Sequence, residues 1–416
     1  MDNSNPVPEH SAPEHSAPEH PVPEHSVPEH SVPDEADPVA NAPAASATAP
    51  PPPAQRSRDR FLDTIRAVAI VRVIVVHLLG RLNLLFWPAP TFVAPGMPMV
   101  FFISGALARQ SLRTVAGRRR SATTYWRATF RRLLVPYWAF YGVVVAMTVA
   151  AALLRDGARY RLDVGELVLG ASGLVIPTGS PVLRHHTGHL WFLVAFMVCS
   201  AAAPPLVRLY ERIGVWVVAI PATVFAVIEW RAWHGTTFTH EVYKTATFAV
   251  PYVVGFAYTD PPFARLGRRA FLATTVACAS VAAWTQAVHP GAANDLGLKH
   301  LATSGAWFAL ALAAAPAIRL AAARGARLLD RVTRRTMTIY LWGWPTSVFA
   351  WRRAGELTDD LAVRRGLYVV FALGLLSLAV ATFGWVEDVA AKRVPLRPPW
   401  PQKVAALLAS TVSRSS

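Results

Sequence analysis

Residues 60–86, RFLDTIRAVAIVRVIVVHLLGRLNLLF, form the stretch that decides the fold. The stretch is long enough to cross a bilayer as a helix, which takes about 20 mainly apolar residues. It nevertheless carries Arg66, Arg72 and His77. Ionisable side chains at membrane depth are costly, so they usually face a protein interior or a polar cavity. The stretch therefore predicts a transmembrane helix with a functional face.

Arg66 and His77 share one face of this predicted helix. They lie eleven residues apart, which is three turns plus about 20° and roughly 16 Å along the axis. By helical rise, His77 lies roughly 24 Å from Phe61, past the midplane of a hydrocarbon core about 30 Å thick. Arg72 points about 240° away from Arg66, and two roles remain open for it: an interhelical contact, or a second contact to the donor of the transferred group.

The composition indicates an all-α integral membrane protein. Of the 416 residues, 53% are hydrophobic and only 16% are charged, which is more apolar than a soluble domain of this size. The net charge is +16, but residues 1–55 hold nine acidic residues and no Lys or Arg. The remaining residues therefore include 41 basic and 16 acidic ones. These basic residues lie in short loops between apolar runs, which favours membrane orientation and anionic ligands over nucleic acid. The two cysteines, Cys199 and Cys278, lie in apolar segments and argue against a disulfide framework or a cysteine metal site.

The chain opens with a repeated pentapeptide. PVPEH, SAPEH, SAPEH, PVPEH and SVPEH occupy residues 6–30, and a Pro- and Ala-rich stretch follows. Proline at this density blocks regular hydrogen bonding, and little apolar surface is present to offset the cost of ordering. We therefore predict a disordered tail over residues 1–55, a membrane domain over 56–390 and a cytoplasmic C-terminal tail over 391–416.

Apolar runs after the tail predict a bundle of about ten transmembrane helices. The positive-inside rule sets their orientation: with a cytoplasmic N-terminus, inside segments hold 27 Lys and Arg and outside loops hold 12. We therefore expect a multi-pass protein of the plasma membrane with both termini cytoplasmic. The predicted spans are residues 62–86, 94–112, 133–154, 189–207, 214–230, 243–259, 270–288, 301–319, 336–353 and 366–386.

Arg66, ten intervening residues and His77, in a span beginning FLDTIRAVAI, resemble the signature of the membrane-bound acyltransferase 3 family. Such enzymes transfer acyl groups, commonly acetyl, to hydroxyls. Four later motifs resemble family spans in the same order, and together the resemblance covers about residues 58–390. The motifs are GMPMVFFISG at 96–105, RRLLVPYW at 131–138, GHLWFL at 188–193 and YLWGWP at 340–345.

The sequence departs from the family pattern at two places. Family members often carry a histidine where this chain has Gly343, so a mechanism that needs a second histidine there does not transfer. They also often carry two arginines three residues apart before the third span, whereas Thr129 stands three residues before Arg132. Arg127 and Arg131 are the candidates to substitute for the missing arginine.

The residue types fit acyl transfer from acyl-CoA. Transfer to a hydroxyl needs a base, and histidine titrates near working pH. The phosphates of a cytosolic acyl-CoA, with acetyl-CoA as the expected donor, would meet Arg66, Arg127, Arg131 and Arg132, because guanidinium groups match phosphate geometry. His77 is then either the general base or a transient acyl carrier, and His189, on the same predicted side, is the candidate to bind the acceptor, a carbohydrate or small molecule. No metal is expected.

Other readings of the same residues remain. Arg66 can serve as an interfacial residue paired with Asp63, and His77 as a buried structural histidine. A secondary transporter or flippase is the main alternative function, with Arg66 and His77 on a substrate path. An inactive scaffold is a third. We expect transport to leave the thioester intact, which separates it from acyl transfer.

Overall fold

A computed structural model describes residues 59–82, 89–93, 96–113, 121–154, 163–177, 181–293 and 295–393. Within these ranges every regular element is a helix and no strand occurs, so the predicted all-α fold is confirmed for the described residues. The predicted tail over residues 1–55 and nearly all of the predicted C-terminal tail lie outside them.

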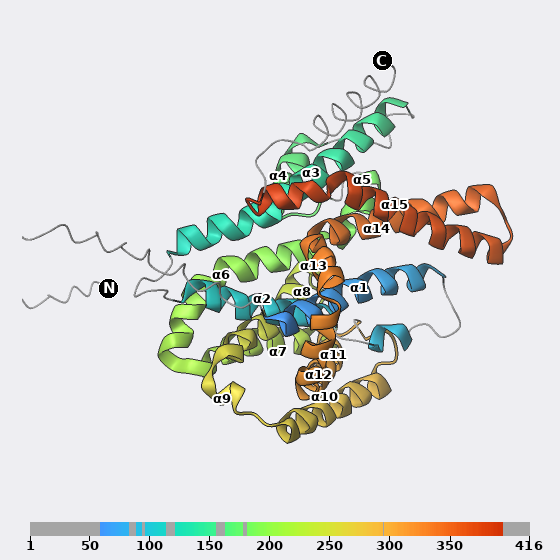
Figure 1. Cartoon of the computed structure of the whole chain (residues 1–416). Coiled ribbons are helices and arrows are strands. Elements are labelled where there is room, and N and C mark those ends of the chain that lie inside the picture. The colour runs from blue at the N-terminus through green and yellow to red at the C-terminus, as the bar shows by residue number, and fades with distance from the viewer. Residues whose placement is uncertain are drawn as a thin grey trace, which may run out of the picture. The chain divides into compact units, whose positions relative to one another are not determined.

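The helices follow one another along the chain with short 3₁₀ segments between some of them (Figure 1). The α-helices are α1 (Arg60–Leu82), α2 (Met97–Leu112), α3 (Ala122–Leu154), α4 (Val164–Ala171), α5 (Pro181–Thr187), α6 (Trp191–Ile213), α7 (Ala219–Trp233), α8 (His240–Val254), α9 (Pro261–Ala264), α10 (Arg268–Val288), α11 (Gly297–Ala313), α12 (Ala315–Arg324), α13 (Ala326–Arg334), α14 (Thr336–Leu357) and α15 (Leu361–Ala390). The 3₁₀ segments are η1 (Ala89–Phe92), η3 (Gly188–Leu190), η4 (Gly214–Val218) and η5 (Gly255–Thr259).

Each predicted span overlaps a helix, but the number of ten spans is not confirmed. Among the described residues, five helical segments are long and apolar enough to cross a membrane, and a sixth is added when the bent pair α11 and α12 counts as one span. The helix α1 is not one of them, because charged residues interrupt its apolar sequence. The predicted span 301–319 is broken by a bend of 78° between α11 and α12, where Pro316 enters the first turn of α12 and has no backbone N–H to donate.

Two glycines allow α2 to pack against the end of α8 and against η5 at backbone contact distance. A Cβ built on Gly105 would lie 1.8 Å from the carbonyl oxygen of Tyr252, and one built on Gly255 would lie 2.1 Å from the carbonyl oxygen of Phe102. Only glycine fits at such an approach. This contact explains the small residue in the motif at 96–105, while Ser104 donates a hydrogen bond to the carbonyl of Val100 at 2.6 Å within its own helix.

The helix α14 packs along α15 and also touches α1 (Figure 1). Gly343 lies close to α1, since a Cβ there would be 2.3 Å from Cδ1 of Ile74. A histidine at this position, as family members often have, would collide with Ile74 unless that side chain moved. The glycine therefore allows α14 to lie close to the helix that carries Arg66 and His77.

A buried ion pair fixes the C-terminal end of α2. The guanidinium of Arg109 is 2.6 Å from the carboxylate of Asp260, and its side chain is only 6% exposed. Tyr210 donates a hydrogen bond to the same carboxylate at 2.5 Å and stacks beneath the guanidinium. Arg113 adds a second, more exposed bridge to Asp260 at 3.1 Å.

We expect Asp260→Ala to lower the free energy of unfolding by about 2 kcal/mol, since it leaves the guanidinium of Arg109 buried without its carboxylate. The value is below that for a fully enclosed pair because the Asp260 side chain is 19% exposed. Thermal unfolding of detergent-purified protein measures the effect. The control is Glu356→Ala, which removes a pair with both side chains 58% exposed and should change stability by less than about 1 kcal/mol. Equal effects of the two substitutions would contradict the expected role of burial.

Candidate active site

A cavity of about 350 Å³, here called the Arg66 cavity, gathers basic side chains from distant parts of the chain. Arg66 comes from α1, Arg132 from α3, Arg334 from the end of α13 and Arg393 from just beyond α15. The wall also contains Glu387 of α15, whose carboxylate accepts a hydrogen bond from the backbone N–H of Thr338. With four cations and one anion, the cavity is suited to a polyanionic ligand.

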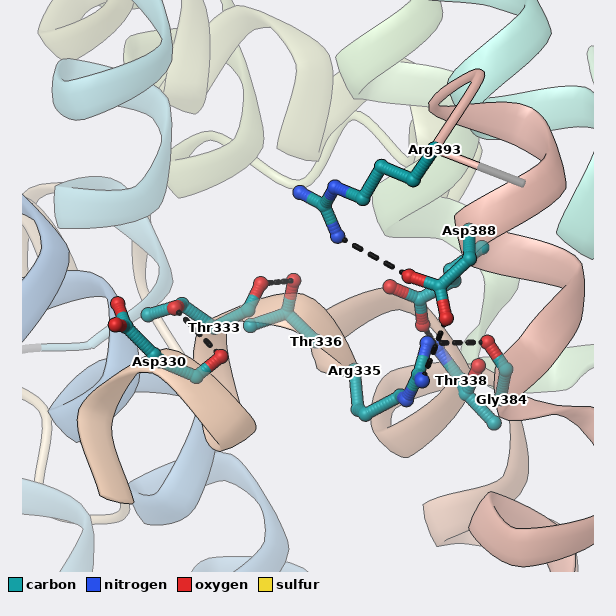
Figure 2. A network of polar contacts seen from close by, with 9 residues as sticks. Asp330, Thr333, Arg335, Thr336, Thr338, Gly384, Asp388 and Arg393 are labelled. Atoms are coloured by element: carbon teal, nitrogen blue, oxygen red, sulfur yellow. Dashed lines mark hydrogen bonds and ion pairs between the residues drawn. The ribbon is translucent and has the colours of Figure 1, made fainter. Parts of the chain in front are cut away.

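A network of hydrogen bonds and ion pairs lies on the α15 side of the Arg66 cavity (Figure 2). Arg335 and Arg393 converge on the carboxylate of Asp388 at 2.7 and 3.3 Å. Arg335 also donates to the carbonyl oxygen of Gly384 at 2.5 Å, which joins the start of α14 to the end of α15. The network thereby holds Arg393 in place at the wall of the cavity.

A second cavity of about 440 Å³, here called the His77 cavity, contains four histidines. His77 and His189 are joined there by His240 of α8 and His300 of α11, and the charged residues of the wall are Arg72, Lys244 and Asp295. The ring of His77 makes an edge contact with Trp344 of α14, with 5.0 Å between ring centroids. The same indole donates a hydrogen bond to the carbonyl oxygen of His185 at 3.0 Å, so α14 and α5 together position the His77 ring.

Two buried histidines in the His77 cavity keep ring nitrogens without a hydrogen-bond partner in the described structure. His300 is 3% exposed, and neither of its ring nitrogens is bonded. His189 is 7% exposed; its Nε2 lies 3.1 Å from the carbonyl oxygen of Leu341, and its Nδ1 is not bonded. A buried polar atom left without a partner costs about 1–3 kcal/mol.

Four of the six site residues predicted from the sequence line these two cavities. Arg66 and Arg132 line the Arg66 cavity, and His77 and His189 line the His77 cavity. Arg127 and Arg131 lie on neighbouring turns of α3 and are not among the described residues that line either cavity.

Arg72, for which a contact between elements and a contact to the acyl donor were both open, makes the first kind of contact and does not line the Arg66 cavity. Its Nε donates to the carbonyl oxygen of Val93 at 3.1 Å, and its Nη2 donates to that of Thr91. The same side chain borders the His77 cavity. Arg72 thus joins α1 to the segment before α2 at the wall of this cavity.

A family model described as an acyltransferase domain matches residues 59–386. The chain belongs to this acyltransferase family. No curated protein and no solved structure gives a significant match. An acyltransferase requires an acyl donor and an acceptor substrate. Within the described part of this acyltransferase, no group of three or more His, Cys, Asp or Glu is arranged to hold a metal ion.

The structure adds candidate site residues that sequence reasoning missed. His240, Lys244, Asp295 and His300 border the His77 cavity, and Arg334 and Arg393 border the Arg66 cavity. Lys244 lies inside a predicted span and His300 just before another, the same signal of ionisable side chains in apolar sequence that singled out Arg66. A larger groove of about 770 Å³ between α1, α12 and α13 is lined by apolar side chains except for Thr64 and Arg72, so it lacks the groups that acyl transfer needs.

Proposed function

We propose that this membrane acyltransferase transfers an acyl group, with acetyl as the expected one, from cytosolic acyl-CoA to a hydroxyl of a carbohydrate or small-molecule acceptor. The donor binds in the Arg66 cavity and the acceptor in the His77 cavity. The observation that carries the proposal is the placement of Arg66 and His77 in separate cavities along one helix. A donor from one side of the membrane can thus meet an acceptor from the other.

The sidedness of the two cavities supports the proposed topology. Arg132, Arg334 and Arg393 come from three segments that the positive-inside rule assigns to the cytoplasm, and all three border the Arg66 cavity. His189, His240 and His300 come from segment ends assigned to the outside, and all border the His77 cavity. A plasma-membrane protein with both termini cytoplasmic therefore presents the Arg66 cavity to cytosolic acyl-CoA.

The reaction proceeds by attack of the acceptor hydroxyl oxygen on the thioester carbonyl carbon. The new carbon–oxygen bond forms as the carbon–sulfur bond breaks. As general base, His77 takes the hydroxyl proton and returns it to the departing CoA thiolate. In the alternative sequence, a ring nitrogen of His77 first displaces CoA and carries the acyl group, which the acceptor oxygen then removes. Both sequences yield one ester and one free thiol.

The experiment that tests the function uses membranes containing the protein, labelled acetyl-CoA and an extract of surface glycans and secreted metabolites. Transfer of label to an extract component, with release of one CoA thiol per ester, supports acyl transfer. Movement of an extract component across the membrane without release of thiol would instead favour the transporter or flippase. Membranes that lack the protein provide the blank.

We expect Arg132→Gln to raise the KM for acyl-CoA by about tenfold, since a charge-assisted hydrogen bond to phosphate contributes about 1.5–3 kcal/mol. The adjacent Arg131→Gln is the matched control, because it removes the same charge from the same helix outside the cavity wall. Steady-state kinetics with varied acyl-CoA measure both. An equal rise for both variants would indicate a general effect of surface charge, and no rise for either would remove Arg132 from the donor site.

A further inference from the structure

The Arg66 cavity and the His77 cavity have one lining residue in common among the described residues, Tyr340. Tyr340 lies in the second turn of α14, at the start of the motif at 340–345, and is 6% exposed. Tyr340 thus borders both cavities.

The Tyr340 side chain contacts one residue from the wall of each cavity. Its hydroxyl donates a hydrogen bond to the backbone carbonyl oxygen of His189, and its ring lies 5.4 Å from the His189 ring. On the other side, the ring centroid of Phe192 is 4.9 Å away, and Phe192 lines the Arg66 cavity. One turn further on, Gly343 of α14 lies next to the Ile74 side chain of α1. The ring therefore occupies a defined position between the two cavities.

We propose that the Tyr340 side chain separates the two cavities and that the acyl-bearing end of acyl-CoA must pass beside it. The size of the Tyr340 ring then limits which acyl groups reach His77. This inference rests on the proposed function. With CoA phosphates at Arg66 and Arg132, the thioester carbon must travel toward His77 before the acceptor hydroxyl can attack it. A small acyl group passes beside the ring, whereas a longer chain needs space that the ring fills.

Shortening the side chain therefore changes donor selectivity. In Tyr340→Leu the aromatic ring is gone, and space opens between Phe192 and His189. One added or missing methylene in an apolar pocket changes the ratio of kcat/KM between two substrates by about 10- to 200-fold. We expect the ratio of kcat/KM for hexanoyl-CoA to that for acetyl-CoA to rise at least about tenfold relative to wild type. Tyr340→Phe keeps the ring and loses only the hydroxyl, so its ratio should stay within about threefold of wild type.

The experiment measures both donors on the same membrane preparation, with the extract component that accepts acetyl from wild type. The ratio is independent of the amount of folded protein. Tyr368→Leu is the matched control: this tyrosine is fully buried and hydrogen-bonded to Ser347 at 2.7 Å, and it lines neither cavity. If Tyr340→Leu fails to accumulate, Tyr340→Met gives the same test.

An unchanged ratio in the Tyr340 variants, or an equal shift in Tyr368→Leu, would overturn the inference while leaving the proposed function in place. Equal use of both donors by wild type would overturn it as well. Wild-type membranes that transfer no acyl group from either donor would instead refute the proposed function, and the inference would fall with it.

Discussion

His77→Ala is expected to lower kcat for acyl transfer by about 10²- to 10⁴-fold, the usual contribution of a positioned acid–base group. The ring borders the His77 cavity and contacts Trp344, whereas the arginines that would bind the donor line the Arg66 cavity. The KM for acyl-CoA should therefore change by less than about threefold. Initial rates of thiol release and of ester formation measure both quantities.

The control for His77 is His234→Ala, since His234 is exposed at the end of α7 and lines neither cavity. It should retain the wild-type rate. A His77→Ala variant with normal turnover and normal amounts in the membrane would remove His77 from the mechanism.

The two roles of His77 are separated by mixing wild type with labelled acetyl-CoA in the absence of acceptor. If His77 carries the acyl group, one equivalent of thiol is released and the label remains on the protein after quenching. If His77 is the general base, neither is observed.

Gly105→Ala is expected to destabilise the fold by about 3 kcal/mol or more, at the upper end of what overpacking costs. The added methyl group would lie 1.8 Å from the backbone oxygen of Tyr252, and a backbone carbonyl in a packed helix cannot move aside as a side-chain tip can. The helix α2 and the end of α8 would then have to separate. Fluorescence-detected size exclusion and thermal unfolding in detergent measure the loss of folded protein.

The control for Gly105 is Gly142→Ala in α3, where a Cβ meets nothing within 4 Å. That change should be neutral or stabilising by up to about 1 kcal/mol, because alanine favours the helix. A Gly105→Ala protein as stable as Gly142→Ala would show that the contact between α2 and α8 adjusts freely.

Much of the fold follows from patterns that are local in sequence. Long apolar runs predicted helices at each of the ten segments, because helix formation in a membrane depends on the segment itself. Several helices were missed. The stretch between the predicted spans 133–154 and 189–207 contains α4 and α5, and α9 and α13 also lie between predicted spans; these helices are too short for periodicity to reveal. The bend before Pro316 was also missed, although proline permits it.

The candidate site was predictable only in part, because local sequence patterns do not show which helices lie side by side. Arg66 and His77 stand out because they are ionisable in apolar sequence, and Arg132 and His189 because of a motif. Their partners Arg393 and His300 belong to distant segments, and which helices lie side by side depends on packing. The contact of Gly343 with Ile74 shows how one such detail sets the position of α14 on α1.

The position of Tyr340 between the two cavities also bears on energy conservation. A plasma membrane stores work as an electrochemical gradient, in which each elementary charge is worth about 2.3 kcal/mol per 100 mV. A continuous water-filled tunnel through the protein would let protons leak down this gradient at all times. If the proposed function holds, the ring of Tyr340, which borders both cavities, would interrupt such a water path while still letting an acyl group pass.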